Sequence, residues 1–390
     1  MAINGDDGDN ILDGGNNDDV INGGNGNDTL NGNGGNDTLV GDRGSDTNNG
    51  GDGRDLIIWN NGDGSDLNDG GDGIDTQQVN GGNGDENFTL QAGGQDFLFD
   101  RVSAVAFTLN DQNIEKLELN ANDGNDSFVV SSLADTDLNE VSFYGGEGND
   151  SLDASATEVK ITASGGGGDD TLLGGSADDI LNGDDGNDVL VGNKGDDWHN
   201  GGNGDDIIVW NNGDGSDNND GGWGHDTQVV NGANGAGDEF VVRAGGNDFL
   251  FDRVNLGPFT LNDTGIENLL VNGGGGDDKM TVADLYDTDL QHITFNGGDG
   301  SDILEASQAC ISVEASGGND RDVLITGSGD DILNGDDGDD VLIGGNGHDI
   351  LTGGAGIDVM VGGQGADEFH VGLGDIVADF QQGIDTIFIV

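Results

Sequence analysis

The chain has 390 residues, of which 78 are acidic and only 10 are Lys or Arg, so its formal net charge is −68. With so few basic side chains, a surface that follows nucleic acid phosphates is excluded, and anionic lipid is an equally poor partner. A compact chain that carries this much like charge needs bound cations to offset its self-repulsion. We therefore expect a fold that depends on ions.

The apolar residues argue against disorder, although glycine accounts for 79 positions. They make up 32% of the chain and recur at regular spacing, which disordered tracts do not show. Cys310 is the single cysteine, so no internal disulfide can form. The first residues lack the basic and apolar parts of a Sec-type signal peptide. No apolar run approaches the roughly 20 residues that span a bilayer, so we expect no membrane span.

A nine-residue repeat begins near the N-terminus. Residues 23–31 read GGNGNDTLN, and further units start at Gly32 and Gly41. The general form is G-G-x-G-x-D-x-U-x, in which U is apolar, and this form is typical of calcium-binding solenoids. Three arrays carry it, over residues 1–78, 165–229 and 317–370. Linkers of Gly and Asp do not place Leu, Ile or Val two residues after each Asp, so we expect folded arrays.

The chemistry of the repeat favours calcium. The first six positions predict a turn in which glycine exposes backbone carbonyls and the sixth residue supplies a carboxylate. The last three predict a short strand whose middle residue points inward. Two units form one coil of 18 residues, so Asp28 should lie beside Asp46, and Leu12 beside Leu30. Carboxylates and carbonyls from stacked turns are the ligands that Ca²⁺ prefers, whereas Mg²⁺ requires a stricter octahedron.

The candidate metal ligands are the aspartates at the sixth position of each unit. In the arrays they are Asp19, Asp28, Asp37, Asp46, Asp55, Asp66, Asp75, Asp170, Asp179, Asp188, Asp197, Asp206, Asp217, Asp226, Asp322, Asp331, Asp340, Asp349, Asp358 and Asp367. Single turn motifs between the arrays add Asp126, Asp150, Asp278 and Asp302. We expect many Ca²⁺ ions per chain, and a calcium-free chain that is unfolded or expanded.

The segments between the arrays, residues 79–164 and 230–316, alternate apolar with polar residues and predict strands. They are copies of each other, since Phe97-Leu98-Phe99-Asp100-Arg101-Val102 recurs 152 residues later. The whole chain is therefore expected to be all-β. We favour a right-handed parallel β-roll or β-helix solenoid in which these segments form wider, irregular coils; a separate β-sandwich is the alternative.

Three inward positions of each module carry a polar side chain instead of an apolar one. Neighbouring coils should stack Asn48 on Asn68, and an internal amide ladder would satisfy both. A hydrogen-bonded or partly exposed His199 is favoured over a transition-metal ligand, because no Cys or second His stands at ligand spacing. The polar inward positions are Asn48, Asn68 and Gln77, then His199, Asn219 and Gln228.

Arg101 and its copy Arg253 are two of the few arginines. An Arg–Asp pair, or a cationic stem over the sheet face, is favoured over a ligand site. Three tryptophans, Trp59, Trp210 and Trp223, could form a sugar-stacking platform. We favour instead that Trp59 and Trp210 shield a coil end where the repeat lengthens from nine to eleven residues.

On these repeats the chain resembles the RTX (repeats-in-toxin) haemolysin-type calcium-binding proteins, whose repeats also occur in secreted proteases, lipases, adhesins and surface-layer proteins. Residues 371–390 are similar to the cap that closes such arrays. The ending Asp385-Thr386-Ile387-Phe388-Ile389-Val390 looks like the acidic and then hydrophobic end of type I secretion substrates. The resemblance implies export through a one-step channel and folding outside the cell, where calcium is plentiful.

The sequence predicts no enzyme, since it has no zinc-protease motif, no nucleophile elbow and no P-loop, and its five histidines are scattered. An extracellular or cell-surface structural protein is favoured, one that assembles a layer, filament or matrix through calcium-bridged or end-to-end contacts between copies. The alternatives are an adhesin or carbohydrate-binding module that takes extracellular polysaccharide, and an accessory repeat domain of a secreted enzyme. Ice binding through outward Thr rows is weaker, because Thr is not maintained in the later arrays.

Overall fold

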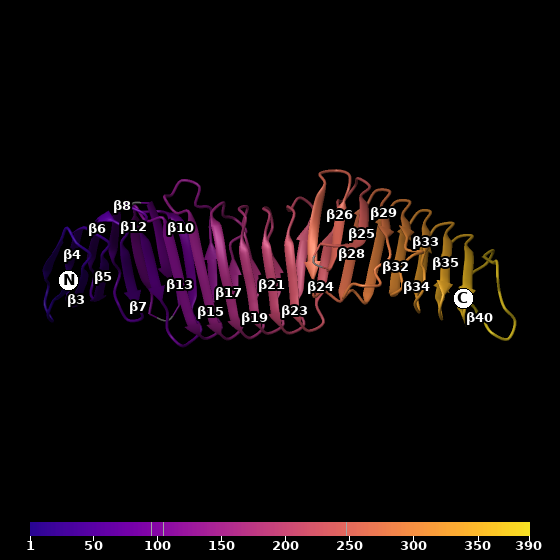
Figure 1. The fold of residues 1–390 in the computed structure, drawn as a ribbon, viewed down its shortest axis with the longest axis horizontal. Coiled ribbons are helices and arrows are strands. Elements are labelled where there is room, and N and C mark those ends of the chain that lie inside the picture. The colour runs from indigo at the N-terminus through magenta and orange to yellow at the C-terminus, as the bar shows by residue number, and fades with distance from the viewer. Residues whose placement is uncertain (95, 104, 247) are drawn as a thin grey trace. The chain divides into compact units, whose positions relative to one another are not determined.

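The computed structural model describes residues 1–94, 96–103, 105–246 and 248–390. They divide into two compact units, Met1–Trp198 and His199–Val390, and this division falls inside the second array. The described residues contain strands and turns and no helix. In each unit the chain passes back and forth between two sheets, which makes it a parallel β-solenoid, and the two units together have about 19 turns (Figure 1). The all-β solenoid expected from the repeat is confirmed.

The strands of unit 1 are β1 (Ala2–Asn4), β2 (Ile11–Gly15), β3 (Val20–Asn25), β4 (Thr29–Gly34), β5 (Thr38–Arg43), β6 (Thr47–Gly53), β7 (Leu56–Asn60), β8 (Leu67–Gly73), β9 (Thr76–Asn80), β10 (Asn87–Gly93), β11 (Asp96–Arg101), β12 (Phe107–Gln112), β13 (Lys116–Asp123), β14 (Ser127–Val130), β15 (Glu140–Glu147), β16 (Ser151–Asp153), β17 (Lys160–Gly167), β18 (Thr171–Leu173), β19 (Ile180–Asp185) and β20 (Val189–Val191). Strand β21 (Trp198–Asn203) begins at the last residue of unit 1.

The strands of unit 2 are β22 (Ile207–Asn211), β23 (Asn218–Trp223), β24 (Thr227–Asn231), β25 (Glu239–Gly245), β26 (Asp248–Arg253), β27 (Phe259–Thr264), β28 (Asn268–Gly275), β29 (Lys279–Val282), β30 (His292–Asp299), β31 (Ile303–Glu305), β32 (Ser312–Asn319), β33 (Val323–Ile325), β34 (Ile332–Asp337), β35 (Val341–Asn346), β36 (Ile350–Thr352), β37 (Val359–Gln364), β38 (Glu368–Val371), β39 (Ile376–Val377) and β40 (Thr386–Ile389).

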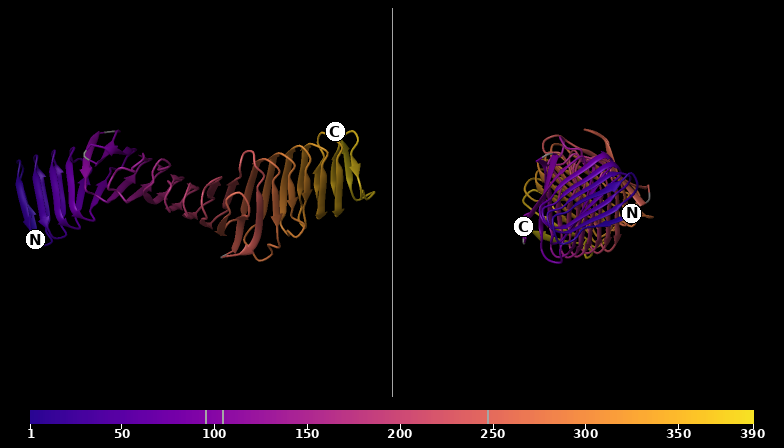
Figure 2. Two further views of the ribbon diagram at one scale, coloured as in Figure 1. Left: turned by 90° about the horizontal axis from the view of Figure 1, so that it is seen from above. Right: turned by 90° about the vertical axis from the view of Figure 1, so that its left-hand side faces the viewer.

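The nonapeptide sets the register. Leu12 pairs with Leu30, and Leu39 pairs with Ile57, so each inward residue lies on its counterpart one coil away. Side chains alternate between buried and outward positions along each strand, and the buried ones fill the space between the two sheets. Each buried Leu contributes roughly 1.5–3 kcal/mol. Within each unit the coils lie one behind another, as Figure 2 shows.

The middle segments continue the solenoid, and the separate sandwich is wrong. Strand β13 pairs in parallel with β9 on one side and with β15 on the other. The structure also has a feature that the sequence did not predict. Strand β11 pairs antiparallel with both β10 and β12, so two extra strands stand between β8 and β10. Unit 2 repeats this insertion, with β26 and β27 between β23 and β25.

Large aromatic side chains fill the wider coils. In unit 1, Phe99 lies 5.6 Å from Phe88 and 5.9 Å from Phe128 between ring centroids. Unit 2 repeats the pattern, with Phe240 and Phe251 5.2 Å apart. All of these rings are buried. The middle segments therefore place a cluster of aromatic rings in the core, where the first array places Leu30 and Leu39.

Candidate metal-binding columns

The turns of the arrays present oxygen atoms to one another. At Gly335, a Cβ atom would lie 2.4 Å from the Gly353 carbonyl oxygen one coil further on and 2.5 Å from Asp340 Oδ2. A side chain there would displace both oxygens, so glycine is required. Gly23 shows the same arrangement in the first array, where the Gly41 carbonyl oxygen and Asp28 Oδ2 converge. A carboxylate and a carbonyl from successive coils therefore meet at each turn.

Backbone hydrogen bonds align the carboxylates into columns. The Asp28 N–H donates to Asp46 Oδ1 at 2.7 Å, and the Asp37 N–H donates to Asp55 Oδ1 at 2.8 Å. The third array repeats the bond, from the Asp322 N–H to Asp340 Oδ1 at 2.8 Å. Each carboxylate is thus held by Oδ1, and its Oδ2 is turned towards the glycine turn.

These Oδ2 atoms are buried and have no hydrogen-bond partner within the described residues. Burial of an unpartnered carboxylate oxygen is costly unless a cation or proton accompanies it. Such oxygens belong to Asp28, Asp37, Asp46, Asp55, Asp75, Asp126, Asp150, Asp170, Asp226, Asp278, Asp302, Asp322, Asp340, Asp349, Asp358 and Asp367.

Burial and neighbouring carboxylates raise the pKa values of aspartates in the columns. Burial, together with the nearby Asp28 carboxylate, raises the pKa of Asp46 to about 6. Burial likewise raises the pKa of Asp170 and of Asp322 to about 7, with neighbouring carboxylates of the same column adding to the effect. A carboxylate with a raised pKa binds either a proton or a metal ion at neutral pH.

The donor set fits Ca²⁺. No three His, Cys, Asp or Glu side chains converge on one point in the described residues, so backbone carbonyls must supply much of the coordination. Ca²⁺ accepts six to eight oxygens, and carbonyls serve as readily as carboxylates. The resident cation would therefore be held by an Asp Oδ2 and by glycine carbonyls of the next coil.

The four aspartates predicted outside the arrays join the same columns. The Asp126 N–H donates to Asp150 Oδ1 at 2.7 Å, and the Asp150 N–H donates to Asp170 Oδ1 at 2.7 Å. In unit 2 the Asp278 N–H donates to Asp302 Oδ1 at 2.7 Å. The columns thus run from the middle segments into the arrays.

Several predicted residues differ in detail from this pattern. Asp179 accepts from the Ile161 N–H at 2.7 Å and from the Gly175 N–H at 2.6 Å, so both of its oxygens are hydrogen-bonded. Asp19 Oδ1 accepts from the terminal ammonium group at 2.6 Å. The remaining candidates are buried in the same columns; they are Asp66, Asp188, Asp197, Asp206, Asp217 and Asp331.

The structure adds column members that sequence reasoning missed. Glu115 Oε2 accepts from the Asp75 N–H at 2.7 Å, and Glu267 Oε2 accepts from the Asp226 N–H at 2.8 Å. Asp375 and Asp385 continue the columns in the same way at the end of the third array. Glu115 and Glu267 lack the glycine pattern, and only the stacking of distant coils brings them into place.

The interior polar positions form the expected ladder. Asn48 Nδ2 donates to Asn68 Oδ1 at 2.9 Å, and Asn68 Nδ2 donates to Gln77 Oε1 and to Asp111 Oδ1. Asp111 is fully buried, which raises its pKa to about 8.

In unit 2, His199 Nδ1 lies 2.8 Å from Asn219 Oδ1, and Asn219 Nδ2 donates to Gln228 Oε1 and Asp263 Oδ1. His199 is hydrogen-bonded, as predicted, but it is buried rather than partly exposed. Asp263 takes the place of Asp111, and burial raises its pKa to about 7.

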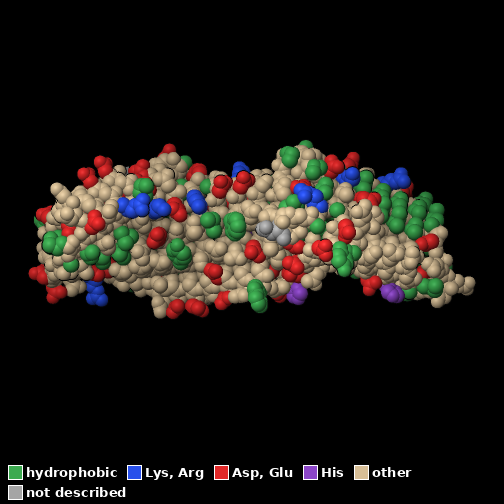
Figure 3. Space-filling model, viewed as in Figure 1, with side chains coloured by type: hydrophobic (Ala, Val, Ile, Leu, Met, Phe, Trp, Pro, Cys, Tyr) green, Lys and Arg blue, Asp and Glu red, His purple; other side chains and the backbone are tan. Residues whose placement is uncertain are grey.

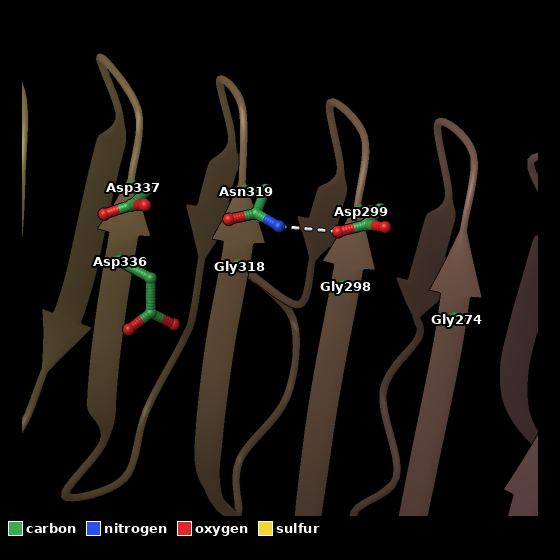
Figure 4. Close-up of a pocket in the computed structure, with 7 residues that line it drawn as sticks. All are labelled: Gly274, Gly298, Asp299, Gly318, Asn319, Asp336 and Asp337. Carbon is green, nitrogen blue, oxygen red and sulfur yellow. Dashed lines mark hydrogen bonds between the residues drawn. The ribbon is translucent and has the colours of Figure 1, made fainter.

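A shallow groove of about 540 Å³ follows the outer side of the turns in unit 2. Asn319 Nδ2 donates to Asp299 Oδ1 across it at 2.6 Å (Figure 4). Its lining consists of Gly274, Gly298, Asp299, Gly318, Asn319, Asp336 and Asp337. The outside of the column is therefore acidic as well.

Comparison with known families agrees with these columns. The model of the RTX calcium-binding nonapeptide repeat matches residues 2–30, 22–57, 142–156, 164–198, 173–208, 183–216, 316–351 and 343–375. The chain carries RTX calcium-binding nonapeptide repeats. No curated protein matches it. RTX repeats are typical of secreted proteins, and they imply calcium binding. No helix in the described residues has the length and hydropathy that crossing a membrane would require.

Proposed function

We propose that this RTX repeat protein is an exported, non-enzymatic protein that folds by binding many Ca²⁺ ions and serves a structural role outside the cell. The observation that supports the proposal is the row of buried Asp Oδ2 atoms that have no hydrogen-bond partner among the described residues and lie beside glycine turns. The aspartates of the columns would be the protein ligands. Bound Ca²⁺ would supply the positive charge that these carboxylates lack.

Binding and folding are coupled in this proposal. Before the coils stack, an Asp of one turn and a glycine carbonyl of the next lie on different parts of a flexible chain. Stacking brings them together, and the ion then offsets the repulsion between carboxylates, so binding free energy acts as folding free energy. Export of an unfolded chain from a calcium-poor interior through a type I channel fits this coupling. The C-terminal tail supports that route by its resemblance to type I substrates.

A structural role is supported by the surface charge. Carboxylates are spread over the visible face in Figure 3, whereas Lys and Arg are few. Ca²⁺ can bridge such faces of separate molecules, which favours a layer, filament or matrix.

Calcium titration of the purified chain tests the proposal. Circular dichroism should show strand signal rising with Ca²⁺ and not with Mg²⁺, while size exclusion shows compaction. Light scattering and electron microscopy of the loaded protein should then show polymers. A chain as compact and strand-rich in chelator as in Ca²⁺ would refute the folding role, and a loaded protein that stays monomeric would refute assembly.

Carbohydrate binding is the second candidate. Trp223 is 82% exposed at the end of β23, and an exposed indole can stack on a sugar ring. Trp59 and Trp210 are buried against Phe107 and Phe259, so they are not available for such a platform. Retention of the protein on a glycan column, and its loss in Trp223→Ala, would support this candidate over assembly.

A further inference from the structure

One position of each module differs from the rest of its column. Residues 81–89 read GGNGDENFT, which is the nonapeptide with Glu86 at the sixth position. A Cβ atom on Gly81 would lie 2.6 Å from Glu86 Oε2 and 2.9 Å from the Ala121 carbonyl oxygen. The Glu86 N–H donates to Asp126 Oδ1 at 2.7 Å, as the Asp126 N–H donates to Asp150 Oδ1 in the next turn. Glu86 therefore stands where the other turns present a ligand.

Both oxygens of Glu86 nevertheless have partners. The Gly82 N–H donates to Oε2 at 2.7 Å, and Arg101 Nη1 donates to Oε1 at 2.5 Å. The ion pair is buried, since both side chains are nearly inaccessible to solvent. By contrast, Asp126 in the next coil keeps a buried Oδ2 that has no hydrogen-bond partner in the described part of the chain. For Glu86 the chain itself supplies a positive charge, which is the guanidinium group of Arg101. For Asp126 the described residues supply none.

The guanidinium group of Arg101 is held in place by several contacts. Nε and Nη2 both donate to the Val105 carbonyl oxygen, at 2.9 and 2.7 Å, and Nη1 also donates to Asn61 Oδ1 at 2.9 Å. Its central carbon lies 5.3 Å from the Trp59 ring centroid and 5.0 Å from that of Phe107. Buried cation–π contacts of this kind stabilise the position of the guanidinium group. Arg101 therefore bridges the turn at Asn61 and the turn at Glu86.

The second module repeats the arrangement with different residues. Arg253 Nη1 lies 3.3 Å from Asp238 Oδ1 and donates to Asn212 Oδ1 at 2.8 Å. Its central carbon lies 5.2 Å from the ring centroids of both Trp210 and Phe259. The Ala233 N–H donates to Asp238 Oδ2 at 2.7 Å, so Asp238 also has no unpartnered oxygen. The same arrangement with Asp in place of Glu shows that the pairing does not depend on one side chain.

The strand insertion explains why a cation is needed there. Strands β11 and β12 lie between β8 and β10, so β8 and β10 do not pair with each other. The turns that precede these two strands are therefore not stacked as neighbouring turns of an array are. Arg101 is the last residue of β11. Strand β11 therefore interrupts the parallel pairing of the coils, and it also places the Arg101 guanidinium group at that interruption. In unit 2, β26 ends at Arg253 in the same way.

We infer that Arg101 and Arg253 are built-in cations that replace a calcium ion at one turn of each column, so that these two turns are held without metal. The inference rests on the proposed calcium function, because it assigns which turns of the columns do not bind an ion. Each module then contains one calcium-independent joint between stacked turns, packed against the aromatic core of the middle segment.

The test counts bound calcium in the full chain by mass spectrometry and equilibrium dialysis at saturating Ca²⁺. The variants are Glu86→Gln, the double change Glu86→Gln with Arg101→Gln, and Asp126→Asn, with circular dichroism as the measure of folding. The double variant removes both charges and leaves no buried guanidinium group unpaired. We expect the calcium count to stay unchanged in the double variant and to fall by at least one in Asp126→Asn.

Two results would have different meanings. A loss of calcium in the folded double variant equal to that in Asp126→Asn would overturn the inference, because Glu86 would then be a metal ligand. A wild-type chain that binds no calcium would overturn the proposed function itself. If Glu86→Gln alone is less stable, an unchanged calcium count in the double variant still supports the built-in cation. The Asp238→Asn and Arg253→Gln pair gives an independent repeat in unit 2.

Discussion

In the first array the core receives one side chain from every nine residues, such as Leu30 and Leu39, whereas the middle segment of unit 1 places Phe88, Phe99 and Phe128 on neighbouring strands. The array has many partnerless carboxylate oxygens at its turns. The middle segment has a joint that Arg101 holds. The difference indicates that the arrays depend on ions for stacking, and that the middle segments depend more on apolar burial.

Removing calcium should separate these two regions most clearly. With chelator, backbone amides of residues 2–57 should lose nearly all protection from hydrogen exchange, because nothing then offsets the carboxylates of their turns. Amides of β10 to β12 should keep more protection. Hydrogen exchange with mass spectrometry measures both, and Mg²⁺ in place of Ca²⁺ is the control. Equal loss of protection in both regions would contradict the conclusion that the arrays depend on calcium more than the middle segments do.

Protonation of the column aspartates at low pH should stabilise the arrays when calcium is absent. The folded-state pKa values of Asp170 and Asp322 are raised to about 7, above their usual value, mainly by burial. Their protonation therefore contributes stability that is fully present below the unfolded-state pKa and is lost as pH rises through about 7. The calcium-free chain should show more strand signal at pH 5 than at pH 8.

Calcium affinity should fall as pH falls through 7, because protons and Ca²⁺ compete for the same oxygens. Calorimetry at pH 8 and pH 6 measures this second effect. An affinity that does not change between these pH values would show that the raised pKa values do not belong to the calcium ligands.

A cavity in the aromatic core should weaken the middle segment even when calcium is saturating. Phe99→Ala removes a buried ring that contacts three others, and we expect a loss of about 3–5 kcal/mol in the free energy of unfolding. The matched control is Val129→Ala, whose side chain is exposed on the same segment, with an expected change within about 0.5 kcal/mol. Denaturant titration measures both. A loss in Phe99→Ala as small as that of the control would argue against apolar burial as the support of this region.

The smallest effect is expected at the interior ladder. The pKa of Asp111 is raised to about 8 by burial, so its contribution to stability is present below its unfolded-state pKa and is lost as pH rises through about 8. Asp111→Asn keeps an acceptor for Asn68 and does not titrate. Between pH 6 and pH 9 the variant should lose about 1–3 kcal/mol less than the wild type. Denaturant titration at both pH values measures this difference, and Asp135→Asn, at an exposed position, is the control. If the stability of Asp111→Asn and of the wild type changed equally between the two pH values, the prediction would be contradicted.

Much of the fold could be predicted from local spacing. The pairing of Leu12 with Leu30 and the bond from the Asp28 N–H to Asp46 follow from a coil of 18 residues. The amide ladder from Asn48 to Asn68 follows in the same way. These contacts join equivalent positions of adjacent coils, so a constant period is enough to place them.

Other parts of the candidate site could not be predicted in this way. Asp111 reaches Asn68 across 43 residues, and Glu115 reaches Asp75 across 40 residues. Glu86 does carry a visible signal, since it ends a GGNGDE motif, but the signal required Glu to be accepted in place of Asp. Nothing in the motif indicates that Arg101 lies beside it.

The sequence by itself determined the repeating turn, the inward apolar residue and the acidic sixth position, because each depends on the conformation of nine consecutive residues. Only the tertiary structure decided which coil follows which in each sheet. The inserted antiparallel strands change that order, and so they decide which carboxylates face an arginine and which face the glycine carbonyls of the next coil. The physical reason is that a contact between coils depends on strand pairing over the whole unit, which no local period contains.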